Sequence, residues 1–325
     1  MNKFVRIIKG SEYSDYTPQD LIHADKNRFK NWSCSAGIEG IFIDWSGDVW
    51  PATCTTGNTK YKLGSVNDAS EIKILQEYIN CDYEYCPCLI EIYLPKYKVK
   101  PQHTLQEGNV LLENFHAIDR ASKFDRDRKY IMWAFGRKCN FSCSYCDDVS
   151  HSKDDKDLVS QEAIDKMLQY AKLYRNGKPI MWSFTGGEPT INPRFLDFVK
   201  KLKEEGDIIT VATNGSQGGE YYSELSKYAN INISVHFEFL KPEKLRKVAE
   251  KILERTPDWF GLNFMIMPGK AELCLQYIEM LKTISNFKKN TNLHFDILRV
   301  KNTSHYEFYS DEDKRIINLL QSGDF

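Results

Sequence analysis

From residue 129 onward, short apolar runs alternate with longer segments whose apolar residues recur every three to four positions. The runs are rich in Ile, Val and Phe and predict buried β-strands, whereas the longer segments predict amphipathic helices. In residues 160–175, for example, Ile164, Met167 and Ala171 share one helical face, and Ser160 can cap the start. The expected strands cover residues 130–135, 179–185, 207–213, 231–239, 261–267 and 293–300. The expected helices cover residues 160–175, 193–206, 220–229, 242–255, 271–285 and a last segment from residue 310.

This alternation of strands and helices predicts an α/β fold with a parallel sheet and right-handed crossovers. Such a sheet can be doubly wound and open, or it can curve into a partial barrel, and the hydrophobic pattern alone does not choose between the two. In both architectures ligands bind at the carboxyl ends of the strands. The residues that directly follow each strand are therefore the first candidates for chemistry.

The residues before this region follow a different pattern. Residues 40–53 predict a β-hairpin that turns at Ser46-Gly47. Residues 70–80, SEIKILQEYIN, predict a helix, and the polar residues 96–128 with the charged run KFDRDRK predict a linker. The expected domains are thus a small cysteine-rich domain at 1–95, a linker at 96–128 and the α/β domain at 129–325.

Composition and charge narrow the possible partners and compartments. The chain has 325 residues, of which 42% are hydrophobic, enough for one large domain and a smaller one. Lys and Arg number 44 against 45 Asp and Glu, so neither nucleic acid nor a membrane is an expected partner. The start lacks the apolar core of a signal peptide, which predicts the reducing cytoplasm, where nine cysteines bind metal more readily than they form disulfides. One of them, Cys274, lies on an apolar helix face and is expected to be buried.

Three cysteines, Cys139, Cys143 and Cys146, follow the first strand of the α/β region in the stretch RKCNFSCSYCDD. A flexible loop with several thiolates suits an iron–sulfur cubane, which needs short, separate reaches to different corners. Three ligands also leave one iron with an open coordination position, as a catalytic metal site requires. The alternatives are chance and a zinc site with a distant fourth ligand, although zinc sites more often use paired Cys-x2-Cys units.

Small and polar residues end the next three strands. Gly186-Gly187-Glu188-Pro189 follows the second strand, where the glycines permit close backbone approach to a small zwitterion and Glu188 can meet its ammonium group. The third strand runs into Asn214, and the fourth carries Ser234 and His236 on one face. An ordinary turn and a packed strand histidine are the alternative interpretations. The position of the glycine turn within the same α/β unit as the cysteine loop favours a ligand site.

The Cys-x3-Cys-x2-Cys and Gly-Gly-Glu-Pro motifs, with Tyr145 just before the last cysteine, resemble those of the radical S-adenosylmethionine (radical SAM) superfamily. The resemblance covers residues 129 to 320 and implies a partial (β/α)6 barrel. It further implies a [4Fe–4S] cluster on Cys139, Cys143 and Cys146, with S-adenosylmethionine (SAM) bound to the fourth iron. In this family the reduced cluster gives one electron to the sulfonium, and the resulting 5′-deoxyadenosyl radical takes a hydrogen atom from the substrate.

The resemblance also assigns roles to residues around the cluster. Gly186-Gly187-Glu188-Pro189 would contact the methionine moiety of SAM, and Tyr145 would border its adenine. Ser234 and Asn214 would reach the ribose or the carboxylate. His236 would face the same cavity or pack within its strand.

Five cysteines precede the barrel: Cys34, Cys54, Cys81, Cys86 and Cys88. The predicted hairpin brings the first two together, and the predicted helix returns the others to the same region. This arrangement resembles the auxiliary-cluster module of radical SAM enzymes called SPASM or, in its short form, twitch, and implies a second [4Fe–4S] cluster. Here the module precedes the barrel instead of following it, and Cys-Pro-Cys replaces Cys-x2-Cys. A structural zinc knuckle is the alternative.

Together these features predict a radical SAM oxidoreductase or maturase that acts on a peptide or protein. A sugar-, nucleoside- or cofactor-type small molecule is the alternative substrate. Two other classes are a non-catalytic iron–sulfur sensor or electron carrier, and a zinc-binding interaction protein. The intact Gly-Gly-Glu-Pro motif argues against a pure carrier, which has no need of a SAM site. The expected protein partner is a one-electron donor such as flavodoxin or ferredoxin.

Overall fold

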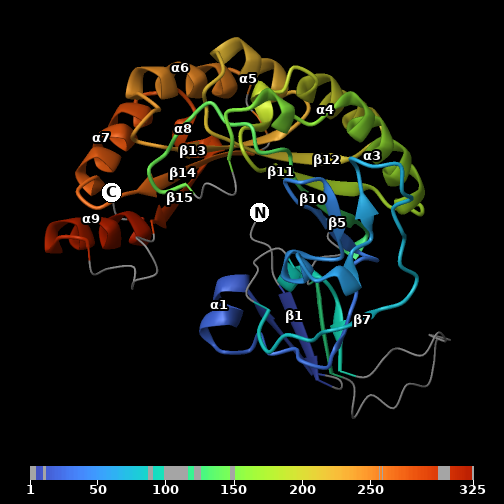
Figure 1. Ribbon diagram of the computed structural model, residues 1–325. Coiled ribbons are helices and arrows are strands. Elements are labelled where there is room, and N and C mark those ends of the chain that lie inside the picture. Colours follow the sequence, from blue (N-terminus) through green and yellow to red (C-terminus); the bar gives the residue numbers. More distant parts are fainter. Residues whose placement is uncertain are drawn as a thin grey trace. The chain divides into compact units, whose positions relative to one another are not determined.

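The computed structural model describes residues 5–9, 12–86, 91–98, 116–120, 126–146, 151–255, 257, 259–298 and 308–323. Cys88 and most of the predicted linker lie outside these residues. The chain divides into two compact units (Figure 1). The N-terminal unit comprises Met1–Ala134 and Ser160–Trp182, and the C-terminal unit comprises Phe135–Val159 and Ser183–Phe325.

A six-stranded sheet of the N-terminal unit has the order β2-β1-β9-β8-β3-β7, and all its neighbouring strands are antiparallel. Val5, Leu21, Phe29 and Ile92 form the core beside it. The strands are β1 (Val5–Lys9), β2 (Glu12–Tyr16), β3 (Ser33–Cys34), β7 (Ile79–Asn80), β8 (Lys96–Tyr97) and β9 (His116–Arg120), with α1 (Pro18–His23) and the 3-10 helix η3 (Glu91–Tyr93). Strand β9 comes from the segment predicted as a linker.

The second sheet of this unit has the order β11-β10-β4-β5-β6, in which β10 and β4 are parallel and β4, β5 and β6 are antiparallel neighbours. Its strands are β4 (Gly40–Ile43), β5 (Asp48–Trp50), β6 (Gly64–Ser65), β10 (Lys129–Ala134) and β11 (Ile180–Thr185), with η1 (Thr53–Thr55), η2 (Thr59–Tyr61) and α3 (Gln161–Tyr174). The boundary between the two units falls within β11, after Trp182.

The predicted β4–β5 hairpin is confirmed, and Asp44 stabilises its turn. The Asp44 carboxylate accepts hydrogen bonds from Ser46 N at 2.8 Å and from Trp50 Nε1 at 2.8 Å. Gly47 adopts a φ of +83°, and a Cβ atom there would lie 2.5 Å from the side-chain amide of Asn67. The turn therefore requires glycine for both its backbone conformation and its space.

The predicted helix at residues 70–80 is wrong, because this segment contains irregular chain that ends in β7. Its backbone bonds to distant chain instead of to itself: Lys73 N donates to Leu63 O at 2.9 Å. Ile72 is buried between two exposed neighbours, the alternation of an extended chain rather than of a helix. Tertiary pairing thus overrides a weak helical pattern, and the predicted hairpin-plus-helix domain is instead built from strands.

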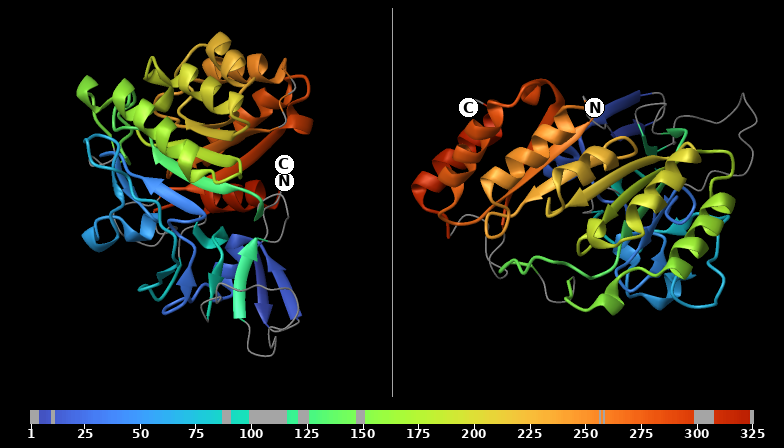
Figure 2. Two further views of the ribbon diagram at one scale, coloured as in Figure 1. Left: turned by 90° about the vertical axis from the view of Figure 1, so that its right-hand side faces the viewer. Right: turned by 90° about the horizontal axis from the view of Figure 1, so that it is seen from above.

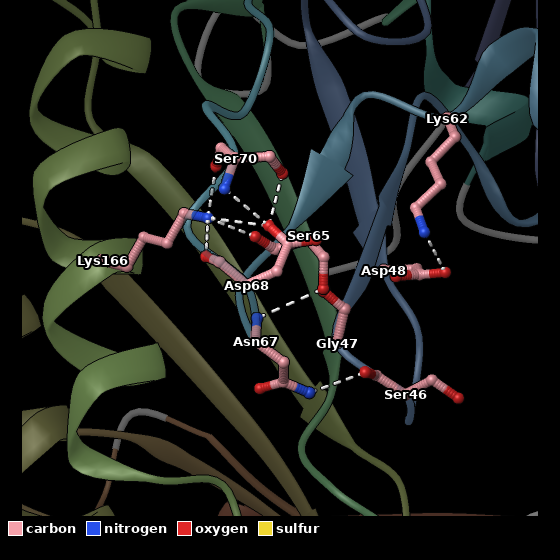
Figure 3. Close-up of polar contacts among 9 residues, drawn as sticks. All are labelled: Ser46, Gly47, Asp48, Lys62, Ser65, Asn67, Asp68, Ser70 and Lys166. Atoms are coloured by element: carbon pink, nitrogen blue, oxygen red, sulfur yellow. Dashed lines mark hydrogen bonds and ion pairs between the residues drawn. The ribbon is translucent and has the colours of Figure 1, made fainter.

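A lysine of α3 holds the loop that follows β6. Lys166 Nζ donates hydrogen bonds to three backbone carbonyls, those of Ser65, Asp68 and Ser70, at 2.5, 2.7 and 2.5 Å (Figure 3). The same loop is tied to the β4–β5 turn through Asn67, whose Nδ2 donates to Ser46 O at 2.7 Å. The ammonium group thereby binds the carbonyl at the end of β6 and two carbonyls of the irregular loop that follows it.

We expect Lys166→Met to loosen residues 65–70 and to lower the free energy of unfolding by about 1–3 kcal/mol, because three carbonyls lose their donor. Hydrogen exchange of the loop and thermal melting measure the two effects. Lys172→Met, an exposed lysine of the same helix, is the matched control. Equal exchange in the two variants would contradict this role of Lys166.

The C-terminal unit contains a sheet of the order β15-β14-β13-β12-β11, in which β12 to β15 are parallel and in register. Its helices α4 to α7 lie along one side of these strands (Figures 1 and 2). The strands are β12 (Ile208–Thr213), β13 (Asn230–Val235), β14 (Phe260–Ile266) and β15 (Thr291–Ile297). The helices are α4 (Phe195–Glu204), α5 (Gly219–Leu225), α6 (Pro242–Leu253), α7 (Ala271–Lys282), α8 (Phe287–Asn290) and α9 (Asp311–Ser322), with the 3-10 helices η5 (Asp155–Asp157) and η6 (Pro189–Ile191).

The predicted α/β class with a parallel sheet is confirmed, and each predicted strand and helix after residue 129 is found within a few residues of its expected position. Cys274 is fully buried in α7, as expected. No helix of the described residues is long and apolar enough to cross a membrane.

The two faces of β13–β15 differ in polarity. Ile233, Leu262 and Phe264 are fully buried on the helix-covered face. We call the other face the open face; its side chains include Asn232, Ser234, Asn263, Met265, His294 and Asp296. Gly261 belongs to the open face as well, and a Cβ atom there would lie 2.5 Å from the Trp259 ring, so this ring takes the place of a side chain.

Candidate functional site

The three cysteines of the motif lie together in the loop after β10. Cys139 N donates to Ser152 O at 2.9 Å, and Cys146 N donates to Cys143 O at 3.0 Å, which folds the loop back on itself. Burial raises the pKa of the Cys139 thiol and raises that of Cys143 to about 11, and the charges of the neighbouring cysteines add to both rises. Three thiols that repel one another as thiolates form a site that a cationic group would stabilise.

The donor set of the loop fits a [4Fe–4S] cluster. Its three cysteine thiols come from one short segment, and a cubane takes each thiolate on a different iron. Among the described residues, no group of three Cys, His, Asp or Glu side chains forms a site for a single metal ion.

The end of β12 holds one side of the cysteine loop. Asn214 is buried, and its Nδ2 donates to Asn140 Oδ1 at 2.9 Å and lies 3.8 Å from Cys139 Sγ. Lys153 Nζ donates to the carbonyl oxygens of Cys139, at 3.0 Å, and of Phe141. Amide and ammonium donors therefore surround the first cysteine, as expected around a negatively charged sulfur ligand.

The segment after β13 holds the other side of the loop. The Tyr145 hydroxyl lies 2.6 Å from His236 Nδ1, and the two rings stack at 5.9 Å. Burial lowers the pKa of His236 to about 4, so the ring is neutral at pH 7. Its Nδ1 can therefore accept a hydrogen bond from the Tyr145 hydroxyl. Glu238 Oε2 accepts a hydrogen bond from Ser144 N at 2.7 Å. The structure therefore brings His236 to the loop, where the ring contacts a side chain of the loop itself.

The glycine turn packs directly against the start of the cysteine loop. Gly187 N donates to Gly136 O at 3.0 Å, and Glu188 N donates to Lys138 O at 2.8 Å. A Cβ atom on Gly187 would lie 2.3 Å from Lys138 O and 2.6 Å from Arg137 O, closer than any side chain allows. Gly186 adopts a φ of +116°. The contact between the two loops thus requires glycine at position 187, and the backbone conformation favours glycine at position 186.

The carboxylate of Glu188 lies inside the protein and connects three segments. Its Oε1 accepts hydrogen bonds from Thr190 N at 3.1 Å, from Thr190 Oγ1 at 2.6 Å and from Thr213 Oγ1 at 2.7 Å. Its Oε2 accepts from Asn214 N at 2.5 Å. Burial raises the pKa of Glu188, while these donors oppose the rise. The expected contact of Glu188 with the SAM ammonium stays a prediction.

We expect Glu188→Gln to lower the free energy of unfolding by about 1–3 kcal/mol, because one side-chain oxygen becomes an NH2 group that faces donors. Thermal melting followed by near-UV circular dichroism measures the loss. Glu220→Gln, whose side chain is 84% exposed in α5, is the matched control. If both variants have the same melting temperature, the hydrogen bonds of Glu188 do not stabilise the fold.

Four of the N-terminal cysteines are described, and they pack in two pairs. Cys34 is buried in a small apolar cluster against which Cys54 packs, as the hairpin predicted. Cys86 is buried in the core beside α1, and Cys81 packs against that core. Burial raises the pKa of Cys81, and the charge of Cys86 contributes. The structure thus pairs Cys34 with Cys54 and Cys81 with Cys86, while the shared cluster site predicted for them stays a prediction.

Some contributors to the site were missed from the sequence. Lys153 and Glu238 contact the cysteine loop, and Asn140 within the loop accepts the hydrogen bond of Asn214. Asn263 and Asp296 project from the open face near Ser234. The sequence did contain a signal for Asn263 and Asp296, because each is a polar residue within an otherwise apolar strand. The predicted contacts of Ser234 and Asn214 with the ribose or carboxylate of SAM stay predictions.

Comparison with known proteins supports the family resemblance in the central part of the chain. Residues 133–260 match the family model of the radical SAM superfamily, which confirms the resemblance for this part of the chain. A GTP 3′,8-cyclase of Rhizobium leguminosarum bv. trifolii (strain WSM2304) is 30% identical over 146 residues, 43% of this chain and 41% of that protein. A probable GTP 3′,8-cyclase of Thermococcus kodakarensis (strain ATCC BAA-918 / JCM 12380 / KOD1) is 26% identical over 158 residues, 45% of this chain and 50% of that protein.

These matches span only part of the relatives, since the chain covers half or less of the length of either cyclase. Among solved structures, Streptococcus suis SuiB bound to S-adenosylmethionine aligns with a TM-score of 0.42 at 16% identity, over 60% of this chain and 44% of that chain.

Proposed function

We propose that this protein is a radical SAM enzyme that cleaves SAM reductively at a [4Fe–4S] cluster held by Cys139, Cys143 and Cys146. The observation that supports this most strongly is the packing of the glycine turn on the cysteine loop, with Gly187 N bonded to Gly136 O at 3.0 Å. This contact places the Gly-Gly-Glu-Pro turn beside the cysteine loop, and a non-catalytic iron–sulfur carrier would have no need of such a SAM-binding motif. When bound, the cluster and SAM supply one-electron bond cleavage and abstraction of a hydrogen atom from the substrate.

The residues of the chain bind and orient these groups. The three thiolates hold the cluster, and Asn214 directs an amide N–H toward Cys139 Sγ at 3.8 Å. Gly186 and Gly187 let the backbone approach the methionine moiety of SAM. The neutral His236 fixes the Tyr145 ring, which we propose to border the adenine. A flavodoxin or ferredoxin would supply the electron.

The test is chemical and needs no knowledge of the substrate. Anaerobically reconstituted protein, reduced with dithionite in the presence of SAM, is expected to form 5′-deoxyadenosine, which mass spectrometry detects. A cluster that is present by its absorbance but forms no 5′-deoxyadenosine would refute the enzyme and favour a sensor or carrier. A colourless protein that contains zinc would refute both.

Two substrate classes are proposed. Peptides or proteins are the first, from the resemblance of the N-terminal cysteines to auxiliary-cluster modules, which would make the enzyme a maturase. A small molecule is the second, and the names of the GTP 3′,8-cyclases support it, since these relatives are named for a nucleotide. Addition of cell-extract peptides or of nucleotides, with substrate-dependent 5′-deoxyadenosine as the readout, distinguishes the two.

We further propose that Cys34, Cys54, Cys81 and Cys86 hold an auxiliary [4Fe–4S] cluster, with Cys88 as a further candidate ligand. The register of β3 and β7 supports this: Cys34 pairs with Ile79, and Cys81 N donates to Trp32 O at 2.9 Å. Cys34 and Cys81 therefore lie on the same face of adjacent strands, two residues apart along them. A zinc ion at this place is the competing assignment, which elemental analysis separates from iron.

A further inference from the structure

The open face of β13–β15 carries polar side chains in rows that run across the strands. Ser234 on β13 pairs in register with Asn263 on β14, which pairs with His294 on β15. The next row toward the carboxyl ends pairs Met265 with Asp296. A polar face opposite a fully apolar one is built to meet water or a polar ligand.

This face begins at the cysteine loop. His236, which contacts Tyr145 of that loop, lies two residues beyond Ser234 and therefore on the same face of the chain. Adjacent strands lie about 4.8 Å apart, so Asp296, two strands away from β13 in the row that His236 continues, is roughly 10 Å from His236 along that row. A small molecule, or one side chain of a larger one, spans that distance.

Asp296 is held in place but keeps one carboxylate oxygen for a partner. Asn263 Nδ2 donates to Asp296 Oδ2 at 2.6 Å, and within the described residues Oδ1 of Asp296 accepts no hydrogen bond. The side chains of Asp296 and His294 are exposed. A carboxylate oriented by an amide is a preorganised acceptor.

Two further acceptors on this face lack a donor. Oδ1 of Asn232 and Oδ1 of Asn263 are buried, and neither accepts a hydrogen bond from the described part of the chain. Buried polar groups are nearly always paired, so these amides are set for a partner that the described residues do not supply. The missing partners are donors in both cases.

Charge points to the same kind of ligand. Among the open-face positions of β12 to β15, all of them described, Asp296 is the one carboxylate, and Lys and Arg do not occur. We infer that the open face binds a group that presents adjacent N–H donors, of the guanidinium or amidine type, with Asp296 as its anchor. This inference rests on the proposed function, because it places the group within reach of the cluster loop.

The shared donor chemistry can come from a nucleobase edge or from an arginine side chain. Two matched probe pairs separate these sources: guanosine with inosine, which lacks the exocyclic amine, and N-acetylarginine amide with N-acetylcitrulline amide, which lacks the charge. Binding to the reconstituted full chain in the presence of SAM is measured by equilibrium dialysis. We expect the donor-rich member of one pair to bind about ten- to hundred-fold more tightly than its partner, as a charge-assisted bond predicts.

Asp296→Asn is expected to remove that difference, whereas Asp311→Asn, the same change at an exposed residue of α9, is expected to keep it. The comparison of the two probes of each pair uses the wild-type protein alone, so it tests the inference even if a variant folds poorly. Equal binding within both pairs, no binding of any probe, or an undiminished difference in Asp296→Asn would overturn the inference. Formation of 5′-deoxyadenosine by the wild type is scored separately, so loss of the proposed function and loss of the ligand site give different results.

Discussion

Replacement of Cys139, Cys143 and Cys146 by alanine is expected to abolish 5′-deoxyadenosine formation and to remove about four irons per chain, those of one cubane. The three thiols are the only protein ligands in the proposed assignment, and they sit in a loop whose backbone is already folded by its own hydrogen bonds. The variant should therefore keep its fold while it loses the metal. Iron analysis and electron paramagnetic resonance measure the cluster, mass spectrometry measures 5′-deoxyadenosine, and circular dichroism measures the fold.

Cys274→Ala is the control for this experiment, because Cys274 is a fully buried cysteine of α7 with no place in the loop. It should keep the iron and the 5′-deoxyadenosine of the wild type. If the triple variant still formed 5′-deoxyadenosine, the assignment of the cluster to this loop would be wrong. If it lost its fold together with its iron, the loop would be a structural metal site instead.

Replacement of both Cys34 and Cys54 by alanine is expected to remove a further set of about four irons and to loosen residues 30–86 in hydrogen exchange. The secondary structure around these cysteines is short: β3 and β6 have two residues each and β5 has three. Among the described residues, the apolar cluster that holds Cys34 contains three other buried residues, Ala36, Ala52 and Leu94. So small a core depends on a metal for much of its stability.

The C-terminal unit should exchange as in the wild type in this double variant, because its own core lies between β12–β15 and their helices. SAM should still be cleaved, since the cysteine loop is unchanged. Cys274→Ala again serves as the control. An iron content equal to that of the wild type would remove the auxiliary cluster from the proposal, and zinc in place of iron would assign a structural knuckle.

The parallel sheet and its helices could be predicted from the sequence because their signals are local. The apolar face of α3 and the alternation in β12 and β13 are each contained in one short window. The cysteine spacing and the double glycine are local as well. The prediction of secondary structure failed where a segment pairs with chain outside its own short window. Strand β1 pairs with β9 more than a hundred residues later, and Lys73 bonds to Leu63 instead of continuing a helix.

The chemistry of the site was predictable by residue type but not by contact. Spacing identifies Glu188 as a candidate, yet nothing in it indicates that Thr190, Thr213 and Asn214 would occupy its carboxylate. In the same way, the contact of Asn214 with Cys139 joins residues that are 75 positions apart. Such contacts depend on which strands become neighbours, which no local pattern specifies.

The bonds of Glu188 have a consequence for binding entropy. Its carboxylate joins η6 to the end of β12, and its N–H joins both to the cysteine loop through Lys138 O. The three segments thus lose their independent motions during folding, before any ligand arrives. A small molecule that binds among them meets a surface that is already ordered, so little conformational entropy is lost at that step.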